Sequence, residues 1–342
     1  MKQLILATGC VALSLMIPLK ASAASMYSEL YVFGDSLSDS GRYYKATNGK
    51  APPLNAFPNK LYTNDQIWPQ YLASRLELSY NPDTNFAIAG AYSGRGNARS
   101  SVAGIDLPGV IDQIDNFITA NPVTDPNALY TIYGSVNDYF YGGQTNTNVP
   151  VANTIEGVTK LVNAGAKNIV VFNSGALQVT PGASLGESVQ TPEGLKALVE
   201  EHNSQLSKAL EDLKQTLDPS VNIIPFDIYS VYLDQVNNPE KYGYTNVDSS
   251  CVNNPLAPTD IPEDCRKKPE NYLWWDTVHF SSQGYSVVAD AVYSRVHATK
   301  VPEPYAGLGL FSVATLSTVL LLKKKQKKVN LVQDIVKEVC AS

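Results

Sequence analysis

The chain has 342 residues, of which 44% are hydrophobic, and a formal net charge of -6 at pH 7. This length and apolar content can fill the core of one large α/β domain with appendages. The acidic balance argues against a nucleic acid as partner, because phosphate binding needs a basic face.

The first segment, residues 1–24, has the pattern of a secretory signal peptide. An early lysine precedes a long apolar run, and Ala21-Ser22-Ala23 offers the small residues that a signal peptidase accepts. The residues before Cys10 faintly resemble a lipoprotein cleavage site, but cleavage there would truncate the apolar run. We therefore expect an exported protein whose body begins near residue 25.

A strand followed by a sharp turn opens the body. The apolar run from Leu30 to Phe33 indicates a buried strand that stops at Gly34. The residues of the types that cap helices follow it: Asp35, Ser36, Ser38 and Asp39. Ser36 would then lie beside free backbone N–H groups and the positive end of a helix, a setting that suits an oxyanion. The alternative is that Ser36 is one of several capping serines.

Two further apolar runs end in residues that can reach the same sheet edge. Residues 85–91 read as a parallel strand that ends in a tight turn at Gly90, where the missing side chain lets a backbone N–H approach a ligand. Residues 128–133 form the next strand, and Asn137 follows it closely enough to turn its amide toward Ser36. In isolation Gly90 would be a turn residue, and Asn137 would form an Asx-turn.

The rest of the body alternates helical and extended patterns. A long loop is expected over residues 42–65, in which Tyr43, Tyr44, Phe57 and Tyr62 either line a cleft or pack within the loop itself. The spacing of apolar residues predicts helices over 68–76, 105–120, 151–164, 191–217 and 281–296, and strands over 168–173 and 221–227. This alternation predicts a parallel sheet covered on both faces.

Two other residues could be mistaken for catalytic groups. The run from Gly182 through Ser184 to Gly186 fits the Gly-x-Ser-x-Gly pattern of the α/β-hydrolase nucleophile, but no strand leads directly into it. We therefore predict that Ser184 is not the nucleophile. His202 lies within a helical stripe of leucines, which predicts a structural role.

Asp276 and His279 are three residues apart, so on a helical turn they can lie side by side. The carboxylate can then accept from one imidazole nitrogen and leave the other facing outward. Such an imidazole can take the proton of an attacking serine and later protonate the leaving alcohol. A surface salt bridge is the usual explanation of this pair when it stands alone.

Four segments in this order resemble the blocks of the GDSL family of SGNH hydrolases. They are the Phe-Gly-Asp-Ser-Leu-Ser-Asp-Ser-Gly run around Ser36, the segment ending at Gly90, the Gly-Ser-Val-Asn-Asp run around Asn137, and the Asp-x-x-His pair. The resemblance spans about residues 30–297. Two positions depart from the pattern: Ser135 stands where relatives commonly have alanine, and Phe280 stands where proline often follows the histidine, so the local backbone can differ there.

The resemblance implies a three-layer, flavodoxin-like α/β/α sandwich with a five-stranded parallel sheet. It implies Ser36 as nucleophile, His279 as base and Asp276 as the residue that orients the base. The N–H groups of Ser36 and Gly90 and the amide of Asn137 would hold the oxyanion. Water would then hydrolyse the acyl-enzyme, and this chemistry needs no metal and no organic cofactor.

The implied substrates are lipid esters, short acyl esters or acetylated polysaccharide. A second possibility is an acyltransferase, in which an alcohol replaces water in the last step. A third is a catalytically silent surface protein that binds glycan or lipid, although intact Ser36, Asp276 and His279 argue against it.

Two of the four cysteines, Cys251 and Cys265, belong to the exported body. Outside the cytosol a disulfide can close the loop between them, and it would contribute on the order of 3 kcal/mol. A zinc site is not expected, because the chain has no paired-cysteine motif and only three histidines.

The hydrolase domain is expected to span residues 25–299, and a sorting or anchoring segment follows. Residues 305–322 are apolar and just long enough to span a bilayer, and the basic cluster after them favours a cytoplasmic carboxyl side. With the preceding Pro-Glu-Pro, residues 300–328 resemble a PEP-CTERM sorting signal, from which the extra tail 329–342 departs. We therefore expect an enzyme of the cell envelope, the cell surface or the medium that meets export and sorting machinery and contacts the membrane through this segment.

Overall fold

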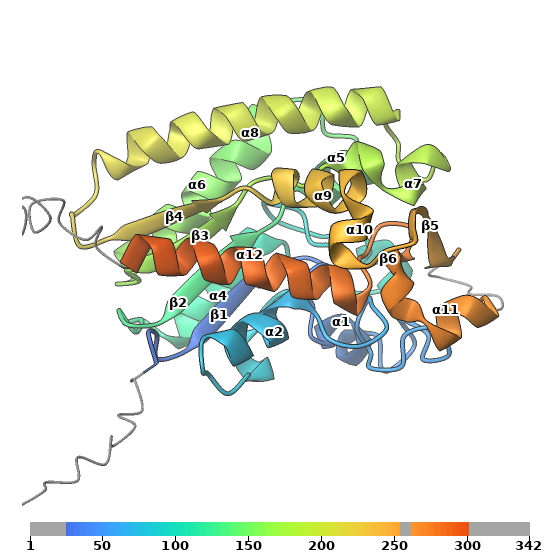
Figure 1. The fold of residues 1–342 in the computed structure, drawn as a ribbon. Coiled ribbons are helices and arrows are strands. Elements are labelled where there is room, and N and C mark those ends of the chain that lie inside the picture. Colours follow the sequence, from blue (N-terminus) through green and yellow to red (C-terminus); the bar gives the residue numbers. More distant parts are fainter. Residues whose placement is uncertain (1–24, 254–260, 301–342) are drawn as a thin grey trace, which may run out of the picture.

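The computed structural model describes residues 25–253 and 261–300, in which a parallel β-sheet lies between two layers of helices (Figure 1). The predicted signal peptide and nearly all of the predicted sorting segment and tail lie outside the described residues. Among the helices of the described part, none has the length and apolar character needed to cross a membrane.

The main sheet has four strands that pair in chain order, all of them parallel. Their bounds are β1 Leu30–Gly34, β2 Leu129–Tyr133, β3 Asn168–Phe172 and β4 Asn222–Phe226. One row across the sheet joins Val32, Thr131, Val170 and Ile224. Because helices cover both faces, the strands are nearly continuous apolar runs, as a buried parallel sheet requires.

The prediction of a regular fifth strand over residues 85–91 is wrong. This segment lies beside β1 and donates two amides to it, but it forms a single parallel bridge, between Asn85 and Val32. The side chain of Gln113 interrupts the ladder, because it accepts from the amide of Gly34 and donates to its carbonyl, each at 2.9 Å. The regular part of the sheet therefore has four strands rather than five.

The segment of residues 85–91 still occupies the place of the missing strand. With that segment at the edge beside β1, the order across the sheet is the flavodoxin-like one, in which the chain winds in opposite directions from β1. The three-layer α/β/α sandwich is thus confirmed. Ligands of such sheets bind at the carboxyl ends of the strands beside the point where the winding reverses.

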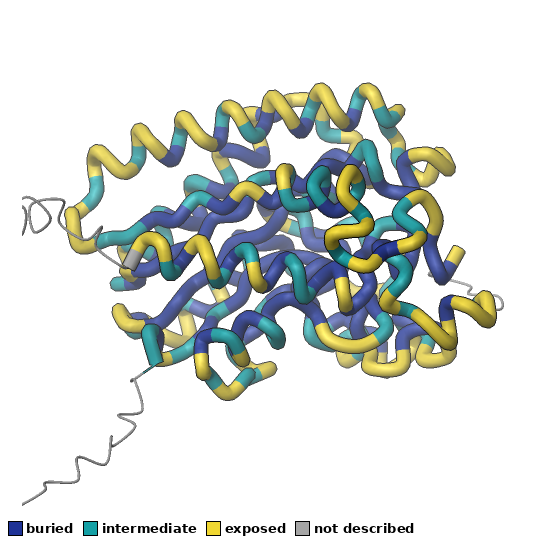
Figure 2. The backbone as a smooth tube through the Cα atoms, in the orientation of Figure 1, coloured by how far each residue is buried: buried dark blue, intermediate teal, exposed yellow. Residues whose placement is uncertain are grey.

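Side chains alternate between the two helical layers along each strand. Val32 and Val170 pack in one apolar cluster, and Phe33 and Val171 pack in the other. The first layer contains α2 (Trp68–Arg75), α9 (Ile228–Asn237) and α12 (Ser282–Lys300), and the second contains α4 (Val110–Ala120), α6 (Asn148–Asn163) and α8 (Pro192–Lys214). Figure 2 shows the buried strands between helices whose outer faces are exposed.

The predicted helix starting at residue 105 begins later, at Val110, because Pro108 and Gly109 precede it and Gly109 is its N-cap. The predicted loop 42–65 contains one short helix, α1 (Arg42–Ala46). Other short helices are α3 (Ser100–Ala103), α5 (Val136–Phe140), α7 (Pro181–Ser184), α10 (Pro239–Tyr242) and α11 (Glu263–Lys267), with 3-10 turns at Pro82–Thr84, Leu177–Val179 and Pro269–Asn271.

A second, two-stranded parallel sheet lies beside the main one. It joins β5 (Asn246–Val252) to β6 (Tyr272–Asp276). A disulfide joins Cys251 of β5 to Cys265 of α11, with 5.7 Å between their Cα atoms. This small sheet was not predicted, and it carries Asp276 at the end of β6.

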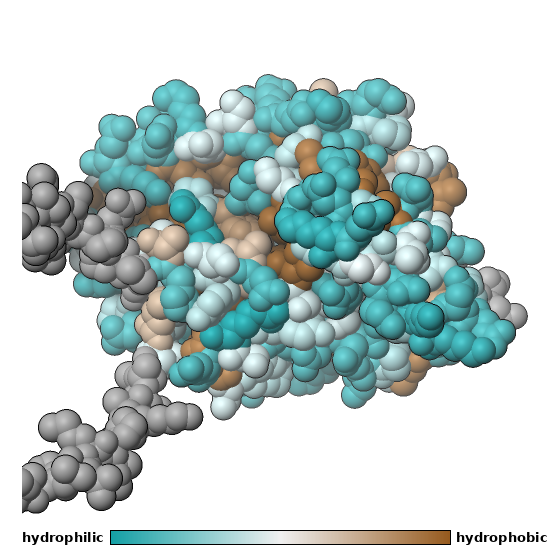
Figure 3. Space-filling view, viewed as in Figure 1, coloured by the Kyte–Doolittle hydropathy of each residue, from teal (hydrophilic) through white to brown (hydrophobic). Residues whose placement is uncertain are grey.

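The surface of the face shown in Figure 3 is mostly hydrophilic. Apolar surface is visible between α8 and α12, the two long helices that run on either side of β4 in this view. Strand β4 is the outer strand of the main sheet, so it pairs with a neighbouring strand, β3, on one side only.

Candidate active site

Ser36 lies in the turn that follows β1. Asp35 shapes this turn, because its carbonyl accepts from the amide of Ser38 and its Oδ1 accepts from the amide of Leu37, each at 3.0 Å. The amide hydrogen of Ser36 itself has no hydrogen-bond partner within the described residues. Ser36 is 8% exposed, so this turn still reaches the surface.

Asp39 joins this turn to the segment that leads to Gly90. It accepts three amides at the start of α1 and, at 2.8 Å, the amide of Ala89. Burial raises the pKa of Asp39, while these amides act to lower it. The capping role of Asp39 could be expected from its place after a strand, but its bond to Ala89 could not, because no local pattern indicates a partner fifty residues away.

His279 connects Ser36 to Asp276. Its Nε2 is 2.7 Å from Oγ of Ser36, and its Nδ1 is 2.8 Å from both carboxylate oxygens of Asp276. All three residues are buried. Oδ1 of Asp276 also accepts the amides of Val278 and His279, so one carboxylate holds both the ring and the backbone of the histidine.

The prediction that Asp276 and His279 share a helical turn is wrong. Asp276 ends β6, and the chain then turns back, so that Trp274 bridges Phe280 in antiparallel fashion. Residues 272–275 include three aromatic side chains, which favour an extended backbone. The two side chains meet because of this reversal and the amide bonds to Asp276.

Tyr62 packs against the imidazole of His279, with ring centroids 4.8 Å apart and planes 30° apart. Tyr43 and Phe57 contact Tyr62 in turn, with ring centroids 6.4 and 5.5 Å away. Three of the four aromatic residues considered as cleft-lining are instead fully buried, in one group beside the imidazole. Tyr44, the fourth, lies under a lysine side chain.

Gly90 occupies a position that needs glycine. Its φ is +85°, and a Cβ there would lie 2.4 Å from Oδ1 of Asn97. Its amide hydrogen has no hydrogen-bond partner in the described part of the chain. The amide of Ser36 also lacks a partner within the described residues, so two free N–H donors lie at neighbouring positions of the sheet edge.

Asn137 lies in α5, directly after β2, and its Nδ2 donates to the carbonyl of Ala91 at 3.0 Å. The structure thus brings Asn137 next to Gly90, and the side chain does not form the Asx-turn considered as the alternative. No hydrogen bond within the described residues joins Asn137 or Gly90 directly to Ser36.

Asp138 holds the same loop. Its two carboxylate oxygens accept the amide and the hydroxyl of Ser93, each at 2.8 Å. Burial raises the pKa of Asp138 to about 6. The sequence singled out Asp138 only as part of a motif, and its tertiary partner became apparent with the fold.

Ser184 and His202 lie apart from this chain of hydrogen bonds. Ser184 is exposed at the end of α7, and no strand leads into it. His202 is buried in α8, with Nδ1 2.9 Å from the hydroxyl of Tyr139, and burial lowers its pKa to about 4.

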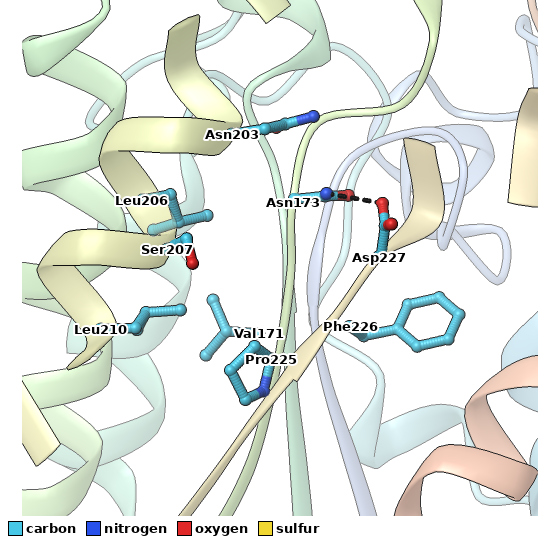
Figure 4. A pocket seen from close by; sticks show the side chains of 9 residues that line it. All are labelled: Val171, Asn173, Asn203, Leu206, Ser207, Leu210, Pro225, Phe226 and Asp227. Carbon is cyan, nitrogen blue, oxygen red and sulfur yellow. Dashed lines mark hydrogen bonds between the residues drawn. The ribbon is translucent and has the colours of Figure 1, made fainter. Parts of the chain in front are cut away.

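A pocket of about 230 Å³ lies between α8 and strands β3 and β4 (Figure 4). Leu206, Leu210 and Val171 line it, and Asn173 donates to Asp227 at its end, at 2.8 Å. None of the predicted site residues contributes to it. Within residues 25–253 and 261–300, no group of three or more His, Cys, Asp or Glu side chains is placed to hold a metal ion.

A parallel α/β/α sandwich thus carries a buried serine, histidine and aspartate in contact at its carboxyl edge, which is the arrangement of side chains that serine hydrolases use. The model of the GDSL-like Lipase/Acylhydrolase family matches residues 30–292, and the chain belongs to this family.

Several named proteins are similar to the chain. Thermolabile hemolysin of Vibrio parahaemolyticus is 24% identical over 285 residues, which are 77% of this chain and 62% of the hemolysin. A GDSL esterase/lipase of Arabidopsis thaliana is 28% identical and covers 72% of this chain and 80% of its own length. Phosphatidylcholine-sterol acyltransferase of Aeromonas hydrophila is 26% identical and covers 71% of this chain and 70% of its own length.

Solved structures are similar at lower identity. An aryl esterase of M. smegmatis has a TM-score of 0.47 and 14% identity, with coverage of 79% of this chain and 99% of that one. The carbohydrate acetylesterase Est24 of Sinorhizobium meliloti has a TM-score of 0.42 and 15% identity, with coverage of 79% and 99%.

Proposed function

We propose that the chain hydrolyses carboxylic esters with Ser36 as the nucleophile. The observation that carries this proposal is the 2.7 Å contact between Nε2 of His279 and Oγ of Ser36, with Asp276 bound to the other ring nitrogen. A carboxylate at Nδ1 keeps the proton on that nitrogen and leaves the lone pair of Nε2 for the serine hydroxyl.

In the first step, Oγ of Ser36 bonds to the ester carbonyl carbon while its proton moves to Nε2 of His279. The carbonyl electrons move to the oxygen, and Asp276 stabilises the imidazolium that forms. When the intermediate collapses, the imidazolium gives its proton to the leaving alcohol and an acyl-enzyme remains. Water activated by the same imidazole then releases the acid and restores Ser36.

The charged oxygen of the intermediate would be held by the amides of Ser36 and Gly90 and by Nδ2 of Asn137. The two backbone donors are free within the described residues, and Nδ2 has a second hydrogen beyond the one given to Ala91. In comparable sites, each such donor lowers the barrier by about 3 kcal/mol.

A comparison of two serine variants tests this proposal. Ser36→Ala should lower kcat/KM for 4-nitrophenyl acetate and butyrate by about 10⁴-fold or more, because both the nucleophile and its activation are lost. Ser184→Ala, the matched control in a similar sequence motif, should keep the rate of the unchanged protein. Loss of activity in the Ser184 variant alone, or its retention in both, would refute the assignment.

The second candidate is acyl transfer, which one relative favours by its printed name, a phosphatidylcholine-sterol acyltransferase. Transfer uses the same acyl-enzyme with an alcohol in place of water. Product analysis with an added acceptor alcohol separates the two: formation of the new ester at the expense of free acid would favour the transferase.

The preferred esters are proposed to be lipid esters, short acyl esters or acetylated polysaccharide. Names of relatives include esterase/lipase and acetylesterase, which support this range. Hydrolysis of esters of graded chain length and of acetylated sugars would show which of these classes gives the highest kcat/KM.

The enzyme is further proposed to act outside the cytoplasm, with residues 25–299 as the hydrolase and residues 300–328 as a membrane-contacting sorting segment. The signal-like pattern of residues 1–24 and the Cys251–Cys265 disulfide support export. Cell fractionation and the N-terminal residue of the mature protein test it. A protein that stays in the cytosol with residues 1–24 intact would contradict the proposal.

A further inference from the structure

Among the described residues, no acidic side chain forms an ion pair with Arg99, whose guanidinium lies over the rings of Tyr43 and Tyr62. Its guanidinium makes no ion pair and no hydrogen bond within the described residues, although the residue is half-buried. Four other arginines donate to carbonyl or carboxylate oxygens: Arg42, Arg75, Arg95 and Arg295. The remaining one, Arg266, is exposed on α11.

The position of Arg99 is next to the proposed reaction centre. Its Cγ would be 2.7 Å from a Cβ added at Gly90, so its stem lies against the proposed oxyanion donor. Its guanidinium carbon is 5.4 Å from the ring centroid of Tyr62 and 5.7 Å from that of Tyr43. Tyr62 in turn stacks on the imidazole of His279.

Two more unpaired groups accompany this cation. The hydroxyls of Tyr43 and Tyr62 are buried and have no hydrogen-bond partner in the described chain. Buried polar groups are nearly always paired, so each of these hydroxyls needs an explanation. Of these three donors, only the guanidinium belongs to a residue that is partly exposed, so it is the one that an oxygen anion from outside can reach.

The carboxylates around the proposed site do not form an ion pair with the guanidinium of Arg99. Asp276 lies close enough for its charge to act on Arg99, but both of its oxygens are bound to His279. The oxygens of Asp39 and Asp138 are occupied by backbone amides and by Ser93. Because a guanidinium stays charged at any ordinary pH and suits carboxylate and phosphate geometry, an anion from outside the chain is the natural partner.

We propose that Arg99 binds an anionic group of the substrate, a carboxylate or a phosphate, so that the preferred esters carry a negative charge close to the ester bond. The inference rests on the proposed ester hydrolysis at Ser36. It narrows the substrate class to acidic esters and makes Arg99 a specificity-determining residue.

Two matched pairs of esters test the inference. The carboxylate pair is 4-nitrophenyl hemiglutarate and neutral 4-nitrophenyl valerate, and the phosphate pair is dihexanoyl phosphatidic acid and dihexanoylglycerol below their aggregation concentrations. In Arg99→Gln, kcat/KM for the acidic member of at least one pair should fall about 30-fold, mainly through KM, because a charge-assisted contact is lost. The neutral member should change less than about threefold, and Arg99→Lys should recover part of the loss.

The pair with the larger effect identifies the anion. Arg266→Gln is the matched control, since it removes an exposed arginine outside the site, and it should leave all four rates unchanged. An equal fall for acidic and neutral esters in Arg99→Gln would overturn the inference, because it would show that Arg99 only supports Tyr62. No fall in either pair would overturn it as well.

A measurement on the unchanged protein covers the case in which Arg99→Gln does not fold. Raising NaCl from 50 to 500 mM should increase KM for the acidic ester by about threefold or more and leave the neutral ester unaffected, because salt screens a charge contact. Equal salt dependence for both would overturn the inference. If the unchanged protein cleaves none of the four esters, the proposed function itself fails. If it cleaves the neutral valerate ester, but Arg99→Gln lowers kcat/KM equally for acidic and neutral esters, only this inference is refuted.

Discussion

Two serines of the chain lie in sequence motifs typical of hydrolase nucleophiles, and their surroundings differ. Ser36 follows a buried strand and contacts a histidine that an aspartate holds in place. Ser184 is the exposed last residue of a short helix whose other three residues are buried. Both serines match a nucleophile motif, so the motif alone does not distinguish them. What distinguishes Ser36 is its position at the end of a strand, beside free amides and residues of the adjacent strands.

The segment around Ser184 still has a place in the site. The amide of Gly182 donates to the carbonyl of Thr277 at 2.7 Å, and Glu187 accepts from the hydroxyl of Thr277 at 2.6 Å. Thr277 lies between Asp276 and His279 in the chain. The region around Ser184 therefore supports the turn that carries the histidine, while the region around Ser36 holds the proposed reacting groups.

After the loss of Ser36 itself, the largest expected effect concerns the carboxylate of Asp276. Asp276→Asn should lower kcat/KM for 4-nitrophenyl butyrate by about 10³- to 10⁴-fold, because the amide no longer stabilises the imidazolium or fixes the tautomer. Glu187→Gln, a carboxylate on the Ser184 side, is the control and should cost less than about tenfold. If the two variants lose activity equally, the distinction between the regions does not hold.

Two glycines with positive φ sharpen the same comparison. Gly90→Ala should lower kcat/KM by about 10²-fold, because the new Cβ would collide with Asn97 and move the proposed oxyanion donor. Gly186 has φ of +74° and open space around it, so Gly186→Ala should cost about 1 kcal/mol of stability through its backbone and leave kcat/KM unchanged. Steady-state kinetics and urea unfolding measure both; equal kinetic losses would contradict the role of Gly90.

The small sheet behind Asp276 can be weakened without touching the site. Replacing Cys251 and Cys265 together by alanine should lower the free energy of unfolding by about 3 kcal/mol, since their separation of 14 residues sets the loop-closure entropy. The folded variant should keep its kcat/KM at 25 °C. A variant as stable as the unchanged protein would show that the bond between β5 and α11 adds nothing to the free energy of unfolding.

An effect on stability alone is expected in α8. The pKa of His202 is lowered by burial from its ordinary value of 6.5 to about 4, so folding favours the neutral ring. This contribution is complete above pH 6.5 and is lost as pH falls toward 4. Between pH 7.5 and 4.5 the unchanged protein should therefore lose about 2 kcal/mol more stability than His202→Asn. Urea unfolding at both pH values tests this, and equal losses would contradict it.

The layers of the fold could be predicted from the sequence because each helix and strand carries its own apolar periodicity. Trp68–Arg75 and Asn168–Phe172 lie almost where the pattern placed them. The strand expected over residues 85–91 is irregular because a glutamine from α4 takes part of its ladder. That replacement depends on tertiary contact, so no local pattern could indicate it.

The proposed catalytic residues were readable because four short motifs carry them in order. The backbone conformation of residues 276–279 could not be predicted, because a spacing of three residues fits a helical turn as well as a strand followed by a chain reversal. The contact of Tyr62 with His279 and the unpaired Arg99 were also missed. Each joins segments that are distant in the chain, and only the folded arrangement shows which charges remain without partners.

The hydrogen bonds of Asp39 bear on which parts of the proposed enzyme can change in related proteins. A single carboxylate binds amides from the segment after β1 and from the segment before Gly90, so the spacing between these two pieces of backbone is set inside the core. The outer loops do not set it. They can therefore change in length and composition, and with them the range of esters accepted, while the two proposed oxyanion amides keep their separation.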